Sequence, residues 1–122
     1  MSATKPTLVL GASENPERYS NRAIRDLQSY HHPLWAIGAR KGMVGSTMIE
    51  TDQIPCPSID TVTLYLSPER QKPYYEYILS LTPHRIIFNP GTENEELAAL
   101  AEQQGIKTIE ACTLVLLRTG QY

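Results

Sequence analysis

The feature of this sequence that most constrains its fold is a short apolar run that ends in three small residues. Residues 7–10 (Thr-Leu-Val-Leu) read as a buried strand, Gly11, Ala12 and Ser13 follow at once, and an apolar helical pattern begins a few residues later. A strand, a small-residue turn and a helix in this order are typical of a turn that binds phosphate at the carboxyl end of a strand. An ordinary surface turn fits the same residues, because short motifs of this kind often arise by chance.

The rest of the chain alternates short apolar runs with longer helical patterns. Further strands are predicted over 34–38, 61–66, 85–88 and 107–110. Residues 43–54 show no clear period and leave room only for a short strand or a helical turn.

Helices are predicted between these strands. The first is capped by Ser20 or Asn21 and ends before Pro33. Residues 67–69 lead into a second, whose start we place near Pro73. A third is capped by Thr92, with Glu95 three residues on, and ends at Gly105. Residues 112–117 fit either a strand or a helix, and we favour a C-terminal helix that packs on the sheet.

Strands that alternate with helices over one core predict an α/β protein with right-handed crossovers. We expect a Rossmann-like three-layer fold, in which a parallel sheet of about five strands carries helices on both faces. At 122 residues the chain is long enough for one such domain, residues 1–122, and too short for a second.

Ligands of folds like this one bind outside the carboxyl ends of the strands, where the strand order reverses. Four turns should meet there, at residues 11–13, 38–41, 66–68 and 89–91. These turns are the predicted site.

The charge balance limits what this site binds. The formal net charge is −2, and acidic and basic residues are interspersed, so the chain lacks the basic face that nucleic-acid binding requires. Cys56 and Cys112 have no metal-ligand spacing and read as reduced thiols. Residues 1–6 lack a signal-peptide core, and no apolar run approaches the ~20 residues of a membrane span. We therefore expect a cytoplasmic protein that binds a small nucleotide and does not associate with membranes.

The residues after the second strand indicate which nucleotide. A dinucleotide fingerprint needs G-x-G-x-x-G at the first turn and an acidic residue after the second strand. This chain lacks the second and third glycines, and Arg40 and Lys41 stand in the acidic position. Cations there favour a nucleotide whose ribose carries a phosphate, so both NADP and coenzyme A (CoA) fit. A solvated pair of surface cations is the alternative.

Several short motifs together resemble one family. They are Val9 to Ser13, Asn15-Pro16, Arg18 to Asn21, the basic pair, Leu66-Ser67-Pro68, Pro90 to Glu96, Gly105-Ile106 and Cys112. In order and spacing they resemble the small stand-alone CoA-binding proteins, which are similar to the nucleotide-binding domain of the succinyl-CoA synthetase alpha subunit. The resemblance covers about residues 7–112. It departs from the family at Gly38-Ala39, where Asn-Pro is usual, and at Asn89-Pro90, where a Gln often stands.

This resemblance implies CoA or an acyl-CoA as ligand and assigns roles to particular residues. Gly11, Ala12 and Ser13 would contact the pyrophosphate, and Arg40 with Lys41 would hold the ribose phosphate. Three residues at the start of the first helix would close the turn or reach the phosphates: Arg18, Ser20 and Asn21. Ser67 with Pro68 would flank the adenine or the pantetheine arm, and Pro90 with Gly91 would also belong to the cofactor-binding residues. Helix capping explains Ser20 equally well, and a tight turn explains most of the character of residues 89–91.

The sequence offers little sign of catalysis or of a metal. His31 and His32 are adjacent at a helix end, where neighbours face different ways, and His84 precedes a strand at the opposite edge from the site. No nucleophile-and-base motif is present, and Cys112 reads as core. The cluster of Tyr74, Tyr75 and Tyr77 indicates a packing face or a homodimer contact. We expect a non-catalytic CoA-binding module. The alternatives are an NADP-dependent enzyme or nucleotide-sensing regulator on the same fold, and a protein-interaction domain with a vestigial site.

Overall fold

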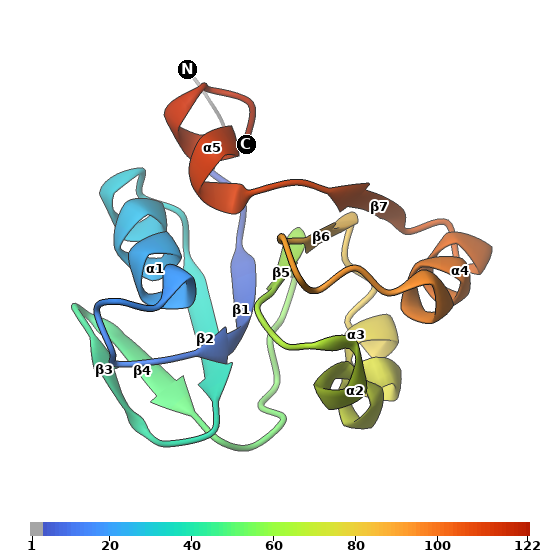
Figure 1. The fold of residues 1–122 in the computed structure, drawn as a ribbon, viewed down its shortest axis with the longest axis horizontal. Coiled ribbons are helices and arrows are strands. Elements are labelled where there is room, and N and C mark those ends of the chain that lie inside the picture. Colours follow the sequence, from blue (N-terminus) through green and yellow to red (C-terminus); the bar gives the residue numbers. More distant parts are fainter. Residues whose placement is uncertain (1–3) are drawn as a thin grey trace.

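The computed structural model describes residues 4–122, which form a seven-stranded sheet flanked by helices (Figure 1). The sheet order is β3-β4-β2-β1-β5-β6-β7, and every neighbouring pair is parallel except β3 with β4. The strands are β1 (Thr7–Ala12), β2 (Leu34–Gly38), β3 (Gly42–Val44), β4 (Thr47–Glu50), β5 (Thr61–Leu64), β6 (Arg85–Phe88) and β7 (Lys107–Glu110). The chain is therefore an α/β protein of the expected Rossmann-like class. The expected absence of a signal peptide falls on residues 1–6, of which the first three lie outside the described part.

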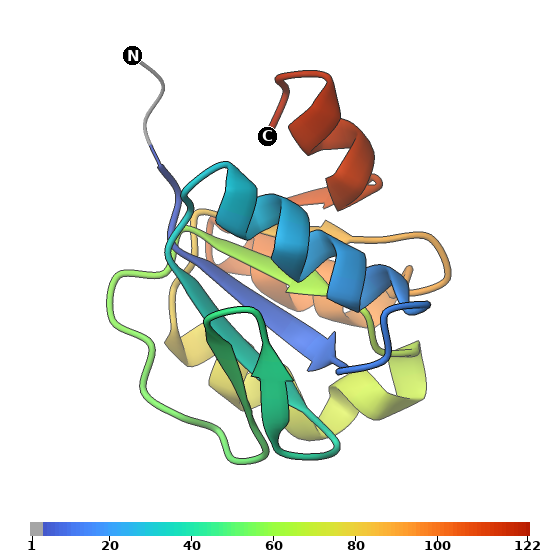
Figure 2. The ribbon, with the colours of Figure 1, turned by 90° about the vertical axis from the view of Figure 1, so that its left-hand side faces the viewer.

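Helices cover both faces of the sheet, as the alternating pattern predicts (Figures 1 and 2). On one face lie α1 (Tyr19–Ser29) and α5 (Thr113–Arg118), which also contact each other. On the other lie α2 (Pro68–Gln71), a short 3₁₀ turn η1 (Lys72–Tyr74), α3 (Tyr75–Ser80) and α4 (Glu95–Gln103).

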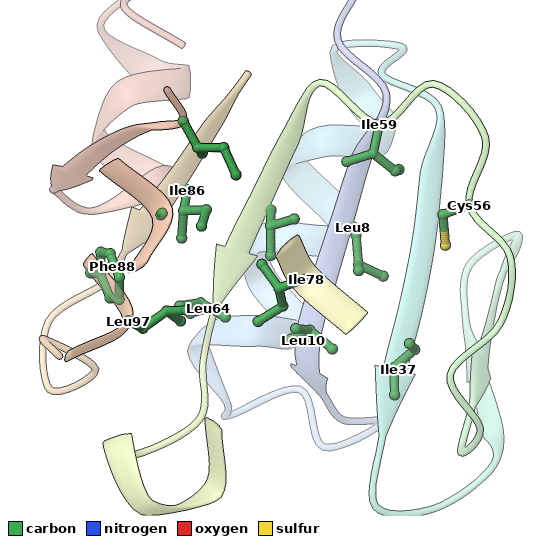
Figure 3. Close-up of a cluster of buried hydrophobic side chains, with 13 residues drawn as sticks. Leu8, Leu10, Ile37, Cys56, Ile59, Leu64, Ile78, Ile86, Phe88 and Leu97 are labelled. Carbon is green, nitrogen blue, oxygen red and sulfur yellow. The ribbon is translucent and has the colours of Figure 1, made fainter. Parts of the chain in front are cut away.

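The central strand β1 supplies both halves of the core. Leu8 and Leu10 point to the face of α3 and α4, where Ile78 of α3 covers them (Figure 3). Val9 and Ala12 point to the other face, against Ile24 of α1. All four strand residues are buried, which explains why β1 reads as a continuous apolar run rather than an alternating one.

The sheet contains two strands more than the expected five or so. Residues 42–50 form a β3–β4 hairpin in which Met43 pairs with Met48, and β4 then pairs in parallel with β2. These two strands are three and four residues long and sit at the edge of the sheet, so they show no apolar period in the sequence.

Two of the predicted helix starts were wrong. Helix α1 begins after Arg18, not after Ser20 or Asn21, because both of these side chains are buried inside its first turn. Helix α4 begins after Asn94, whose side-chain oxygen accepts from the Leu97 amide at 3.2 Å. The Thr92 hydroxyl instead donates to the Asn89 carbonyl. The segment after residue 67 is helical in three pieces: α2 begins at Pro68, the 3₁₀ turn follows, and α3 begins at Tyr75, close to the expected start near Pro73.

Other expectations concern single residues. Tyr74, Tyr75 and Tyr77 are half-buried and pack against the core, as expected for a packing face. Cys56 is buried and Cys112 is half-buried, and both are free thiols.

Within residues 4–122, no helix combines the length and apolarity that crossing a bilayer requires. In the same residues, no three metal-ligating side chains gather.

Candidate functional site

A cavity of about 670 Å³ opens at the carboxyl ends of four parallel strands. It lies where the strand order reverses, because the chain leaves β1 toward β2 on one side and later returns to β5 on the other. All four predicted turns contribute to its wall. The lining residues are Gly11 to Asn15, Arg18 to Ser20, Ala39, Arg40, Tyr65 to Ser67, Arg70, and Pro90 to Thr92. A cavity of this size lies within the ~300–1,000 Å³ range of small-molecule sites.

Gly11 shapes the floor of this cavity. Its φ of +97° belongs to the region that favours glycine, and the pairing of β1 with β2 is irregular at this residue. A Cβ at position 11 would also meet the backbone of Tyr65 at 2.8 Å. The neighbouring strand is equally tight, since a Cβ on Gly38 would collide with the Ala12 carbonyl oxygen. The two glycines let three strand ends approach closely.

The first turn is held in shape by its own side chains. Ser13 Oγ accepts from the Asn15 amide at 3.1 Å, and the Asn21 side-chain amide donates to the Ser13 carbonyl at 2.9 Å. Asn21 is therefore buried behind the turn and does not line the cavity. The amides of Tyr19 and Ser20 have no acceptor among the described residues, and both residues line the cavity. Unpaired amides at the start of an 11-residue helix are suited to an anion.

The charges of the cavity are mostly positive. The side chains of Arg18, Arg40 and Arg70 line it, and none of them forms an ion pair with a described residue. The one acidic lining residue, Glu14, accepts a hydrogen bond from the Met43 amide at 2.8 Å. The cavity is thus a cationic region on a chain whose formal net charge is −2.

The wall on the far side comes from the loops after β5 and β6. Ser67 from the first loop and Pro90 and Gly91 from the second line the cavity. The second loop is also a tight turn, closed by the Thr92 amide on the Asn89 carbonyl at 2.9 Å. The Asn89 side chain points away from the cavity, where it bonds Thr63, the Leu64 carbonyl and the Thr113 amide.

Sequence reasoning found most of this wall but not all of it. Three of the predicted residues do not line the cavity: Asn21 is buried, Lys41 is exposed beyond the rim, and Pro68 begins α2. Tyr19, Tyr65 and Arg70 line it although no role was assigned to them. The sequence gives a signal for Arg70, because this residue is three positions after Ser67, which follows the predicted strand 61–66. Glu14, which also lines the cavity, lies directly after the predicted turn residue Ser13.

The histidines lie away from this cavity. His31 and His32 border a separate cavity of about 520 Å³ beside the start of β2. Burial, together with the Lys5 and Arg85 charges, lowers the pKa of His32, and Asp60 opposes part of this shift. Its Nδ1 accepts from the Lys5 amide at 2.9 Å. Neither histidine nor Cys112 touches the cavity at the strand ends.

The fold and this cavity define a Rossmann-like domain with a cavity lined by arginines at its topological switch point. A family model described as CoA binding domain matches residues 5–118, and the chain belongs to that family.

Solved structures show the same fold. A crystal structure of an uncharacterized protein is 44% identical, covers 99% of this chain and 100% of its own, and superposes with a TM-score of 0.96. A protein from Thermus thermophilus (18% identity, 98% and 91% coverage, TM-score 0.84) shares the fold. A hypothetical protein from Pyrococcus horikoshii OT3 (19% identity, 94% and 83% coverage, TM-score 0.81) also shares it. A search of the curated proteins found no match.

Proposed function

We propose that this protein binds CoA or an acyl-CoA in the cavity at the strand ends. The observation that carries the proposal is the meeting of two features in one cavity: the small-residue turn after β1, with its open helix amides, and the unpaired Arg40 after β2. Membership of the CoA-binding domain family supports it.

In this proposal each part of the wall has a role. The Gly11-Ala12-Ser13 turn and the amides of Tyr19 and Ser20 receive the pyrophosphate, because backbone N–H groups and the helix dipole favour an anion. Arg40 receives the ribose phosphate through its bidentate guanidinium. Ser67, Pro90 and Gly91 flank the adenine or the pantetheine arm.

We further propose that the domain acts by binding rather than by catalysis. Among the residues that line the cavity, no histidine or cysteine is present, and the Ser13 hydroxyl is engaged by the Asn15 amide. A nucleophile needs an adjacent base, and the one carboxylate of this wall, Glu14, is engaged by the Met43 amide.

Calorimetric titration with CoA, dephospho-CoA, NADP and ATP tests the proposal. We expect CoA to bind more tightly than dephospho-CoA, which lacks the ribose phosphate. Bound CoA should also raise the melting temperature, since a ligand at 100 times its Kd adds about 2.7 kcal/mol to the unfolding free energy. Binding of NADP without CoA would replace this proposal by an NADP-dependent enzyme or regulator. Binding of neither ligand would leave a vestigial site.

A further inference from the structure

The loops after β5 and β6 are joined behind the cavity by one buried side chain, Gln71. Gln71 is completely buried, and its Nε2 donates to the Leu66 carbonyl and to the Thr92 carbonyl, both at 2.8 Å. Leu66 and Thr92 both line the cavity, from different loops. One amide group therefore sets the spacing of two walls of the site.

A second amide fixes the first. The Asn94 side chain donates to Gln71 Oε1 at 2.9 Å and to the Tyr75 hydroxyl at 2.8 Å. Its own oxygen caps α4 at the Leu97 amide. Tyr75 in turn donates to Glu96 at 2.9 Å. Both N–H bonds and the oxygen of Gln71 are used, so this side chain is held in one orientation without an unpaired buried group.

The hydrogen bond from Gln71 to the Leu66 carbonyl also fixes the direction of the Ser67 N–H, which belongs to the same peptide. In a trans peptide the N–H points away from the C=O, and no cis peptide occurs among the described residues. Because the Leu66 carbonyl faces Gln71, the Ser67 N–H faces away from the buried network. That amide has no acceptor among the described residues, and Ser67 lines the cavity.

We propose that Gln71 is a positioning residue for the ligand. It holds the two loops at a fixed separation and presents the Ser67 amide to the cavity as a hydrogen-bond donor. This inference rests on the proposed CoA binding, and it adds a residue that the ligand itself does not touch.

The test compares Gln71→Met with a matched control, Gln28→Met. Gln28 also uses its Nε2 to bridge two groups, the Val44 carbonyl at 2.6 Å and the Thr47 hydroxyl at 2.7 Å, but neither of these lines the cavity at the strand ends. We expect Gln71→Met to raise the Kd for CoA at least tenfold in titrations at a temperature where the variant is folded. We expect Gln28→Met to stay within twofold of the wild type.

A second measurement separates positioning from stability alone. In amide-resolved NMR spectra, CoA should shift the Ser67 resonance in the wild type and in Gln28→Met, and should shift it by less than half as much in Gln71→Met. If Gln71→Met does not fold, Asn94→Asp replaces it, because aspartate keeps the helix cap and loses the donation to Gln71. We expect that variant to raise the Kd several-fold.

The outcomes distinguish the two proposals. A wild-type protein that does not bind CoA overturns the proposed function. A wild type that binds CoA, with a Gln71 or Asn94 variant of unchanged Kd and an unchanged Ser67 shift, overturns the positioning role and leaves the proposed function standing.

Discussion

A Cβ atom on residue 11 would lie 2.8 Å from both the carbonyl carbon and the carbonyl oxygen of Tyr65. Gly11 is thus the point at which the first turn touches the end of β5. The same residue has a φ of +97°, so two separate constraints require a glycine at the floor of the cavity. Gly91, at the cavity rim, has a φ of +89° but nothing within 4 Å of its added Cβ. Substitutions at Gly11 therefore meet both backbone strain and steric contact, whereas substitutions at Gly91 meet backbone strain alone.

We expect Gly11→Ala to lower the free energy of unfolding by about 3 kcal/mol or more. A backbone strain of about 1–3 kcal/mol adds to an overpacking cost of about 1–3 kcal/mol. Gly91→Ala should lose only the strain, about 1–2 kcal/mol. Urea denaturation of both variants without ligand measures the difference. Equal losses would show that the contact with Tyr65 relaxes without cost.

Arg40 and Lys41 should behave differently although they are neighbours. We expect Arg40→Ala to weaken CoA binding by tenfold or more, since hydrogen bonds to charged groups are worth about 1.5–3 kcal/mol. Dephospho-CoA should lose at most about twofold, because it lacks the phosphate that Arg40 is proposed to hold. Lys41→Ala should change neither Kd appreciably, since Lys41 lies beyond the cavity rim and exposed ion pairs are worth little. Equal losses for both ligands in Arg40→Ala would remove the phosphate assignment.

Tyr65 and Tyr77 offer a second matched pair. The Tyr65 hydroxyl is buried without a hydrogen-bond partner among the described residues, and burial raises the pKa of Tyr65. The Tyr77 hydroxyl donates to the Ile54 carbonyl. We expect Tyr65→Phe to leave the unfolding free energy unchanged or to raise it. Tyr77→Phe should lower it by about 1–3 kcal/mol, because the Ile54 carbonyl then keeps only the weak Cys56 thiol donor at 3.5 Å. Thermal and urea unfolding measure both, and a large loss in Tyr65→Phe would reveal a partner for that hydroxyl.

The environment of His32 predicts a loss of stability in mild acid. Its pKa is lowered in the folded protein by burial and by the charges of Lys5 and Arg85. Between that lowered pKa and the ordinary value of about 6.5 the unfolded chain binds more protons, so stability falls as the pH falls through this range. His32→Asn keeps an acceptor for the Lys5 amide and cannot titrate. We expect the wild type to lose more unfolding free energy than His32→Asn between pH 8 and pH 5.5. A parallel loss in the two proteins would contradict the assignment.

The sequence predicted the fold class and the position of the site because both depend on local signals. The buried β1 run, the glycine turn at residue 11 and the apolar strands 34–38 and 85–88 each carry their pattern within a few residues. Their meeting at one sheet edge follows from parallel topology. Arg40 could be placed for the same reason, since it directly follows a strand.

What the sequence could not predict depends on contacts between distant residues. Thr92 and Asn94 both suit a helix cap, and the choice fell to Asn94 because its amide also bonds Gln71 and Tyr75. Asn21 looked like a ligand residue, but its contact with the Ser13 carbonyl buries it. The β3–β4 hairpin is too short to show a period, and the hydrogen bond from the Met43 amide to Glu14 joins residues 29 positions apart.

The hydrogen bond between Glu14 and Met43 bears on the rate at which an anionic ligand associates with the cavity. This carboxylate accepts from a backbone amide, and the arginines that line the cavity form no ion pair with any residue from 4 to 122. An anionic ligand of the proposed kind would meet these guanidinium groups without first breaking an ion pair. Its association rate should therefore be high and should fall as the ionic strength increases.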